Sequence, residues 1–164
     1  IRDVYKRQID DRLIHGQIAT IWSKASGCNR IMACSDEVAK DDLRKQLLLQ
    51  VALKGIKAYV IPIETAIKAY KDPKYKNFKT LFLFTNPADV LRMIEGGVDI
   101  KSVNVGGMCY KDGKKQITGA ISVNNQDIEC FKKLYEKGIE LEIRQVAKDN
   151  KINLIDRLKE LKFL

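Results

Sequence analysis

The sequence has only one histidine and four cysteines in 164 residues. None of the cysteines forms a C-x-x-C pair, and a single histidine leaves little to complete a zinc site, so we expect no metal. No disulfide framework is evident either, and we interpret the cysteines as reduced thiols of a cytosolic protein. They are Cys28, Cys34, Cys109 and Cys130.

Long apolar runs and nucleotide-binding loops are also missing. No apolar stretch approaches the roughly 20 residues that a membrane-spanning helix needs, and no basic-then-apolar leader is present, so we expect a cytoplasmic protein. The sequence contains no G-x-x-x-x-G-K-[ST] or G-x-G-x-x-G loop and no G-x-S-x-G elbow. These absences argue against P-loop enzymes, dinucleotide-binding enzymes and α/β-hydrolases, and we expect no organic cofactor.

The composition, with 45% hydrophobic and 31% charged residues, is typical of a single folded domain spanning residues 1–164. The formal net charge is +9. The lysines are spread along the chain, many beside acidic residues, and we identify no compact Lys/Arg block with interleaved aromatics. We therefore interpret them as solvated faces with a general preference for anionic partners. We expect no nucleic-acid partner, although a basic nucleic-acid-binding domain remains an alternative.

Short β-rich segments alternate with longer helical ones, which predicts an α/β domain with a mainly parallel, open sheet and helices on both faces. The predicted strands are 30–34, 57–61, 80–84, 102–105 and 140–144. The predicted helices are 16–24, 36–53, 64–70, 85–96, 124–137 and 154–161.

Three of these elements carry more detailed predictions. Leu43, Leu47 and Val51 are spaced four apart on one face, with Leu48 beside them, which predicts the buried face of helix 36–53. The Asp112-Gly113 turn predicts a hairpin. Alternating polar and apolar residues over 140–144 predict a half-exposed or edge strand.

Residues 1–8 fit this pattern poorly. They should form the first, central strand, yet they include four charged residues and few apolar ones, whereas a central parallel strand is normally apolar. We therefore expect residues 1–8 to be non-native, with a genuine but divergent strand as the alternative.

The strongest chemical signal is His15, because acidic Asp10 and Asp11 and basic Arg12 lie just upstream. An imidazole oriented by a carboxylate and accompanied by a guanidinium can accept and pass on a phosphoryl group. Either aspartate could hold the ring, and Arg12 could bind phosphoryl oxygens. Gly16 opens the predicted helix, whose N–H groups favour anions, and Gln17 could donate a hydrogen bond. A histidine without a function is the alternative.

Further polar loops follow predicted strands, and parallel sheets bind ligands at the carboxyl ends of their strands. Gly106 and Gly107 permit close backbone approach and could offer N–H donors. The hydroxyls of Ser35 and Thr85 could bind a ligand or simply cap helices. Cys109 could be a phosphocysteine, but a buried thiol is the favoured interpretation. The loop residues predicted at this edge are Ser35, Asp36, Thr85, Asn86, Gly106 and Gly107.

The segment around His15 resembles the active-site loop of the mannose/fructose/sorbose-type enzyme IIB of the bacterial sugar phosphotransferase system. Its sequence is Ile9-Asp10-Asp11-Arg12-Leu13-Ile14-His15-Gly16-Gln17. Segments 35–41, 85–90, 104–108 and 142–146 resemble family segments in the same order, so the resemblance covers residues 9–161. The sequence departs from the family at Gln8, where an arginine is usual.

The resemblance implies a seven-stranded, largely parallel sheet and a phosphotransferase in which His15 is the transient phosphohistidine. Asp10 would orient the ring and Arg12 would stabilise the transferring group. A phosphorylated enzyme IIA would be the donor, and membrane-embedded IIC and IID components would present the sugar, so that the protein would be peripherally associated with a membrane. The identity of the sugar and formation of a homodimer stay open. A catalytically silent regulatory module of the same fold is the alternative.

Overall fold

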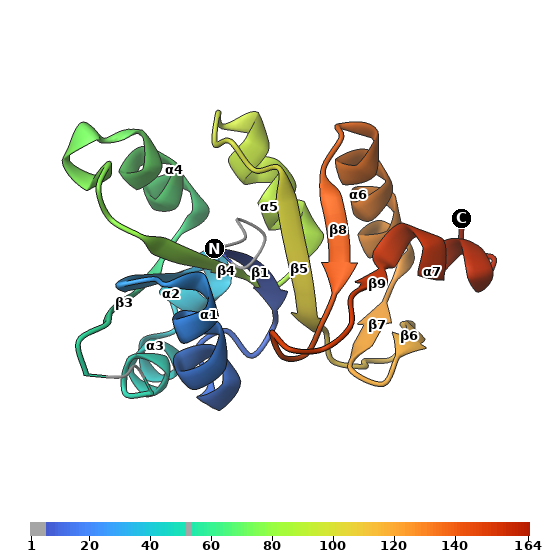
Figure 1. Cartoon of the computed structure of the whole chain (residues 1–164), viewed down its shortest axis with the longest axis horizontal. Helices are drawn as coiled ribbons and strands as arrows, with labels where there is room; N and C mark the ends of the chain where they lie inside the picture. Colours follow the sequence, from blue (N-terminus) through green and yellow to red (C-terminus); the bar gives the residue numbers. More distant parts are fainter. Residues whose placement is uncertain (1–5, 52–53) are drawn as a thin grey trace.

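The computed structural model, which describes residues 6–51 and 54–164, is built on a seven-stranded sheet of order β3-β2-β4-β1-β5-β8-β9 (Figure 1). Neighbouring strands are parallel except β8 and β9, which are antiparallel. The predicted α/β fold is therefore confirmed. The strands of this sheet are β1 (Arg7–Asp10), β2 (Arg30–Cys34), β3 (Lys57–Ile61), β4 (Thr80–Phe84), β5 (Ser102–Gly107), β8 (Glu140–Ile143) and β9 (Ile152–Asn153).

Helices cover both faces of the sheet because strands such as β2 and β4 are apolar on both sides. In β2, Ile31 and Ala33 belong to one buried cluster, whereas Met32 and Cys34 belong to the other. The cluster that contains Ile31 and Ala33 is covered by the π-helix η2 (Ile18–Trp22), α2 (Asp36–Ala39) and α3 (Asp42–Leu49). The other cluster is covered by α4 (Ile63–Lys71), α5 (Pro87–Glu95), α6 (Asn125–Glu136) and α7 (Leu154–Glu160).

Among the helices of the described ranges, none has the length and apolar character that a membrane span requires.

The helix predicted over 36–53, of which residues 52–53 lie outside the described residues, is broken in two, and of its predicted buried face only Leu48 is buried. Asp41 has extended backbone angles and its side chain accepts a hydrogen bond from the Arg44 N–H, so it begins a second helix, α3. The break reorients the following turns. Leu43 and Leu47 are 73% and 55% exposed, while Leu48 alone in α3 is buried at 8%.

The C-terminal half differs from its predictions in two places. A hairpin is present, formed by β6 (Lys115–Thr118) and β7 (Ile121–Val123), but residues 119–120 connect its strands and Asp112-Gly113 only leads into it. β8 is not an edge strand, because the short β9 pairs with its outer side. The alternation of polar and apolar residues in β8 was misleading, because the polar residue Glu142 is buried and its carboxylate lies 3.4 Å from the Arg144 guanidinium.

The N-terminal segment supplies the central strand despite its charges. Arg7 and Gln8 are buried in β1, between β4 and β5, and the Arg7 guanidinium lies 4.9 Å from the Phe82 ring centroid. Residues 1–5 lie outside the described residues, so the expectation that residues 1–8 are non-native stays a prediction.

Candidate functional site

The loop that follows β1 reverses the chain within a few residues. Leu13 adopts a left-handed conformation with φ of 57°, which is unusual for a leucine, and its N–H donates to the Asp10 carbonyl at 2.8 Å. The side chains of Leu13 and Ile14 are buried and hold this turn in place. Such strain persists only where the surroundings enforce it. As a result, His15 returns to face the end of β1.

Asp10 and His15 form the centre of the site. Asp10 Oδ2 lies 3.0 Å from His15 Nε2, and the Asp10 side chain is only 4% exposed. The His15 side chain is 17% exposed, so it can be reached from solvent. Within the described part of the chain, Nδ1 has no hydrogen-bond partner. A carboxylate at Nε2 favours a proton on that nitrogen, which leaves the lone pair on Nδ1.

Arg12 donates three hydrogen bonds to the same carboxylate. Its Nε donates to Asp10 Oδ1 at 3.0 Å, its Nη2 donates to Oδ2 at 2.8 Å, and its backbone N–H donates to Oδ1 at 3.1 Å. Burial alone would raise the pKa of Asp10, but hydrogen bonds and charge from His15 and Arg12 outweigh it and lower that pKa. The hydrogen bond to Asp10 correspondingly raises the pKa of Arg12. Asp10 is therefore an anion at neutral pH.

Gly106 and Gly107 bring β5 against this carboxylate. A methyl group on Gly107 would lie 3.2 Å and 3.3 Å from the two Asp10 carboxylate oxygens and 3.4 Å from Arg12 Nη2, and one on Gly106 would lie 3.3 Å from Asp10 Oδ2. These distances are tighter than ordinary contacts. The predicted close approach of backbone is present, but the group it approaches is the Asp10–Arg12 pair.

Asp11 takes a different role from Asp10. Its Oδ2 accepts a hydrogen bond from the Cys109 N–H at 2.7 Å, while its carbonyl accepts one from Arg44 Nη2 of α3 at 3.1 Å. These contacts tie the His15 loop to β5 and to α3. The prediction that Cys109 is a buried thiol was wrong, because Cys109 is exposed. The charge of Asp11, with smaller effects of burial and a hydrogen bond to Asp11, raises the pKa of the Cys109 thiol.

Most of the other predicted site residues act as helix caps at the same edge of the sheet. The Ser35 hydroxyl caps α2 and the Asn86 side chain caps α5, with the Thr85 hydroxyl accepting from Asn86 Nδ2. Asp36 accepts from Arg92 Nη1 at 2.7 Å and from the Ile63 N–H at 2.9 Å.

Gly16 is the first residue of the helical segment that leads into η2, and Gln17 is half-buried without a side-chain capping bond. In the described ranges, no group of three or more His, Cys, Asp or Glu residues could hold a metal ion.

A buried polar row behind the site was not identified from the sequence as functional. Gln8, Asn104 and Glu142 are in register across β1, β5 and β8, on the face that also carries Asp10. Asn104 Nδ2 donates to Gln8 Oε1 at 2.6 Å and to the Arg144 carbonyl at 3.0 Å. This row fixes the loop after β8 beside the site. The only sign of this polar row in the sequence is that polar residues occupy positions within strands.

Comparison with known proteins places this geometry in a family. The family described as "PTS system sorbose subfamily IIB component" matches residues 5–164. The sorbose-specific EIIB component of Klebsiella pneumoniae is 45% identical over 156 residues, which is 95% of each chain. The mannose-specific EIIAB component of Escherichia coli K12 is 51% identical over 94% of this chain. The chain spans about half, 48%, of that relative.

Solved structures agree with the sequence matches. The crystal structure of the IIBSor domain of the sorbose permease from Klebsiella pneumoniae has a TM-score of 0.94 to this structure, with 43% identity over 99% of this chain and 100% of that one. The fold, the His15 loop and the match over residues 5–164 therefore show that this chain belongs to the sorbose subfamily of phosphotransferase-system IIB components.

Proposed function

We propose that this protein accepts a phosphoryl group on His15 from a phosphorylated enzyme IIA and transfers it to a sugar. The observation that carries this proposal is the constellation of His15, Asp10 and Arg12 at the carboxyl end of the central strand. The matched relatives support it, because their names assign them to sugar-specific phosphotransferase systems. The comparisons give no support to a silent interaction module or a nucleic-acid-binding domain.

The geometry favours Nδ1 of His15 as the nucleophile. In our proposal, its lone pair attacks phosphorus while the bond between phosphorus and the donor's imidazole nitrogen breaks. Nε2 keeps its proton, so the phosphorylated ring gains positive charge, which the Asp10 anion at 3.0 Å stabilises. Transfer to a sugar hydroxyl reverses these roles: the Nδ1–P bond breaks and its electron pair returns to Nδ1, while the sugar oxygen bonds to phosphorus and releases its proton to solvent.

Arg12 can assist without releasing Asp10. An arginine has five N–H donors, and Arg12 uses one on Nε and one on Nη2 to bind the carboxylate. The remaining donors can contact phosphoryl oxygens, and the side chain is 45% exposed. We infer that Asp10 fixes the guanidinium beside His15, so that little reorganisation is needed when the phosphoryl group arrives.

The partners follow from the family. The name of the Escherichia coli relative joins IIA and IIB in one protein, which supports a IIA donor for this chain. Membrane-embedded IIC and IID components would then present the sugar, and peripheral association with them at the cytoplasmic face of the membrane is part of this proposal. The net charge of +9 would speed encounter with an anionic partner surface. The sugar itself is not assigned, and a homodimer stays a prediction.

Phosphoryl transfer from phosphoenolpyruvate tests the proposal directly. The purified protein is incubated with the general phosphotransferase proteins and a mannose-family IIA, and its intact mass is measured. We expect an acid-labile gain of one phosphoryl group. His15→Gln is the matched control, because its amide can still donate to Asp10 but cannot accept phosphate.

His15→Ala is measured beside it, with circular dichroism to verify folding of both variants. No mass gain in folded protein with several IIA donors, or a gain that persists in His15→Gln, would contradict the proposal.

A further inference from the structure

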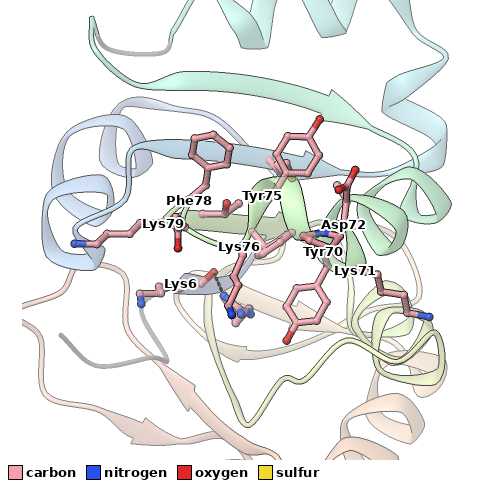
Figure 2. Close-up of a pocket in the computed structure, with 15 residues that line it drawn as sticks. Lys6, Tyr70, Lys71, Asp72, Tyr75, Lys76, Phe78 and Lys79 are labelled. Atoms are coloured by element: carbon pink, nitrogen blue, oxygen red, sulfur yellow. Dashed lines mark hydrogen bonds between the residues drawn. The ribbon is translucent and has the colours of Figure 1, made fainter.

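A basic, aromatic cavity lies at the edge of the sheet opposite His15. It has a volume of about 800 Å³ and is formed by the C-terminal end of α4, the segment 72–79 and the amino-terminal ends of β1 and β4 (Figure 2). Since His15 follows the carboxyl end of β1, this cavity is separate from the proposed phosphoryl site. Its volume is within the range of small-molecule pockets.

The residues lining the cavity are unequal in charge. Among the described residues that line it, Lys6, Lys71, Lys76 and Lys79 are basic, and Asp72 is the only acid. The Asp72 side chain already accepts a hydrogen bond from the Lys74 N–H at 3.0 Å. The interpretation that the lysines are only spread along the chain was therefore wrong for segment 70–79. In this segment, lysines are interleaved with aromatic residues, in the sequence Tyr-Lys-Asp-Pro-Lys-Tyr-Lys-Asn-Phe-Lys. The cavity carries a net positive charge that favours an anion.

Flat apolar surfaces accompany this charge. Phe78 and Tyr70 are 41% and 39% exposed, respectively, and the centroids of Phe78 and Tyr75 are 5.8 Å apart. Figure 2 shows the Phe78 and Tyr75 rings in one part of the view and the Tyr70 ring in another, with the Lys76 side chain to the left of the Tyr70 ring. Exposed apolar surface rimmed by polar residues is typical of ligand-binding grooves.

A buried arginine lies behind these rings. The Arg30 guanidinium is 3.7 Å from the Phe78 centroid and 5.3 Å from that of Tyr75, and Arg30 is 6% exposed. In the described ranges no carboxylate forms an ion pair with it. Arg30 therefore orients the Phe78 ring by a cation–π contact and adds positive charge behind it.

From this combination we propose that the cavity binds a nucleoside phosphate. The base stacks on the exposed Phe78 ring, beside the Tyr75 ring that is tilted 40° from it, and such stacking tolerates any base. The phosphates contact the ammonium groups of Lys76 and Lys79. The number of lysines favours a diphosphate or triphosphate over a monophosphate. Binding at this edge is independent of phosphoryl transfer at His15.

Fluorescence anisotropy with an ADP analogue labelled on its ribose tests this site. The full chain is titrated at fixed ionic strength, and unlabelled ADP, inorganic pyrophosphate, a sugar 6-phosphate and a short poly(U) oligonucleotide serve as competitors. We expect ADP to compete best. Equal competition by pyrophosphate would overturn the stacking of a base, better competition by the sugar phosphate would overturn the nucleoside, and tighter binding of poly(U) would indicate an RNA surface instead.

Two double variants provide the matched charge control. Lys76→Gln with Lys79→Gln should weaken binding of the labelled ADP by about tenfold or more, since hydrogen bonds to charged groups are worth roughly that factor. Lys132→Gln with Lys133→Gln removes the same charge from exposed positions on α6 and should change it little. Equal weakening by the two double variants would show non-specific attraction and contradict the proposal.

The aromatic part is tested by Phe78→Leu, with thermal unfolding followed by circular dichroism. We expect ADP to lose affinity in the folded variant while pyrophosphate does not. Undiminished ADP binding, or no binding of ADP to the unmodified protein at millimolar concentration, would overturn the assignment. Phosphorylation of His15 should be unchanged in both lysine variants, so failure of this proposal is distinguishable from failure of the proposed function.

Discussion

Asp10 shares one carboxylate oxygen, Oδ2, between His15 Nε2 at 3.0 Å and Arg12 Nη2 at 2.8 Å. The two basic groups of the site are therefore coupled through a single buried anion. A change at Asp10 affects both the orientation of the imidazole and the position of the guanidinium. This coupling makes Asp10 the most informative residue to vary after His15.

Asp10→Asn should slow phosphorylation of His15 by about a hundredfold, a typical effect of losing one preorganised electrostatic partner. The amide retains the shape of the carboxylate but not its charge, so it cannot stabilise the positive phosphorylated ring or bind Arg12 as tightly. Rapid-quench sampling followed by intact mass gives the rate.

Asp11→Asn is the matched control for this measurement. An asparagine carbonyl can still accept the hydrogen bond from the Cys109 N–H, and in the described structure no hydrogen bond or ion pair joins Asp11 to His15. We expect its phosphorylation rate to remain within about threefold of that of the unmodified protein, a factor worth roughly 0.6 kcal/mol. Equal losses in both aspartate variants would refute a special role for Asp10.

The stabilising contribution of Asp10 should depend on pH. Its pKa in the folded protein is lowered below its ordinary value of 3.8, so the folded state favours the anion. This contribution is present above the pKa of the unfolded chain and is lost as pH falls through the lower folded value. Urea unfolding of the protein and of Asp10→Asn should therefore show a difference in unfolding free energy at neutral pH that shrinks below about pH 4. A difference that grows with acidity would contradict the ion-pair geometry.

Gly107→Ala should reduce both stability and phosphorylation. Its methyl group would lie 3.2 Å from Asp10 Oδ1, so the carboxylate must shift, and overpacking of this kind costs about 1–3 kcal/mol. Gly119→Ala is the control, because nothing lies within 4 Å of its added methyl group. Chemical denaturation and the mass assay measure the two effects. A Gly107→Ala protein as stable and as active as Gly119→Ala would show that the close approach has no consequence.

The sequence was sufficient to predict the alternation of strands and helices and the grouping of Asp10 and Arg12 with His15, because these depend on local patterns. Residue patterns alone did not distinguish Asp10 from Asp11, and only the family resemblance implied Asp10, since the choice depends on the left-handed turn at Leu13. They also missed the polar row of Gln8, Asn104 and Glu142. Their contacts join strands far apart in the sequence, and a buried polar residue in a strand resembles an exposed one until its partner is known.

Leu47 and Leu48 provide a test of the corrected burial in α3. The spacing of apolar residues predicted Leu47 to be buried, whereas it is 55% exposed and Leu48 is 8% exposed. Leu48→Ala should lower the unfolding free energy by about 2–4 kcal/mol, and Leu47→Ala should change it by less than about 0.5 kcal/mol. Urea denaturation of the two variants measures this contrast. A larger loss for Leu47→Ala would restore the original prediction.

The final prediction concerns Cys109, the other nucleophile at this edge. Cys109 is exposed and its backbone N–H binds Asp11, so it lies beside the His15 loop. The charge of Asp11, together with burial and a hydrogen bond, raises the pKa of its thiol and keeps it protonated at neutral pH. Since the thiolate is the nucleophilic form, Cys109 is poorly suited to accept phosphate. Cys109→Ser should therefore gain one acid-labile phosphoryl group at the same rate as the unmodified protein. Loss of phosphorylation in folded Cys109→Ser, with its retention in His15→Gln, would identify the cysteine as the carrier.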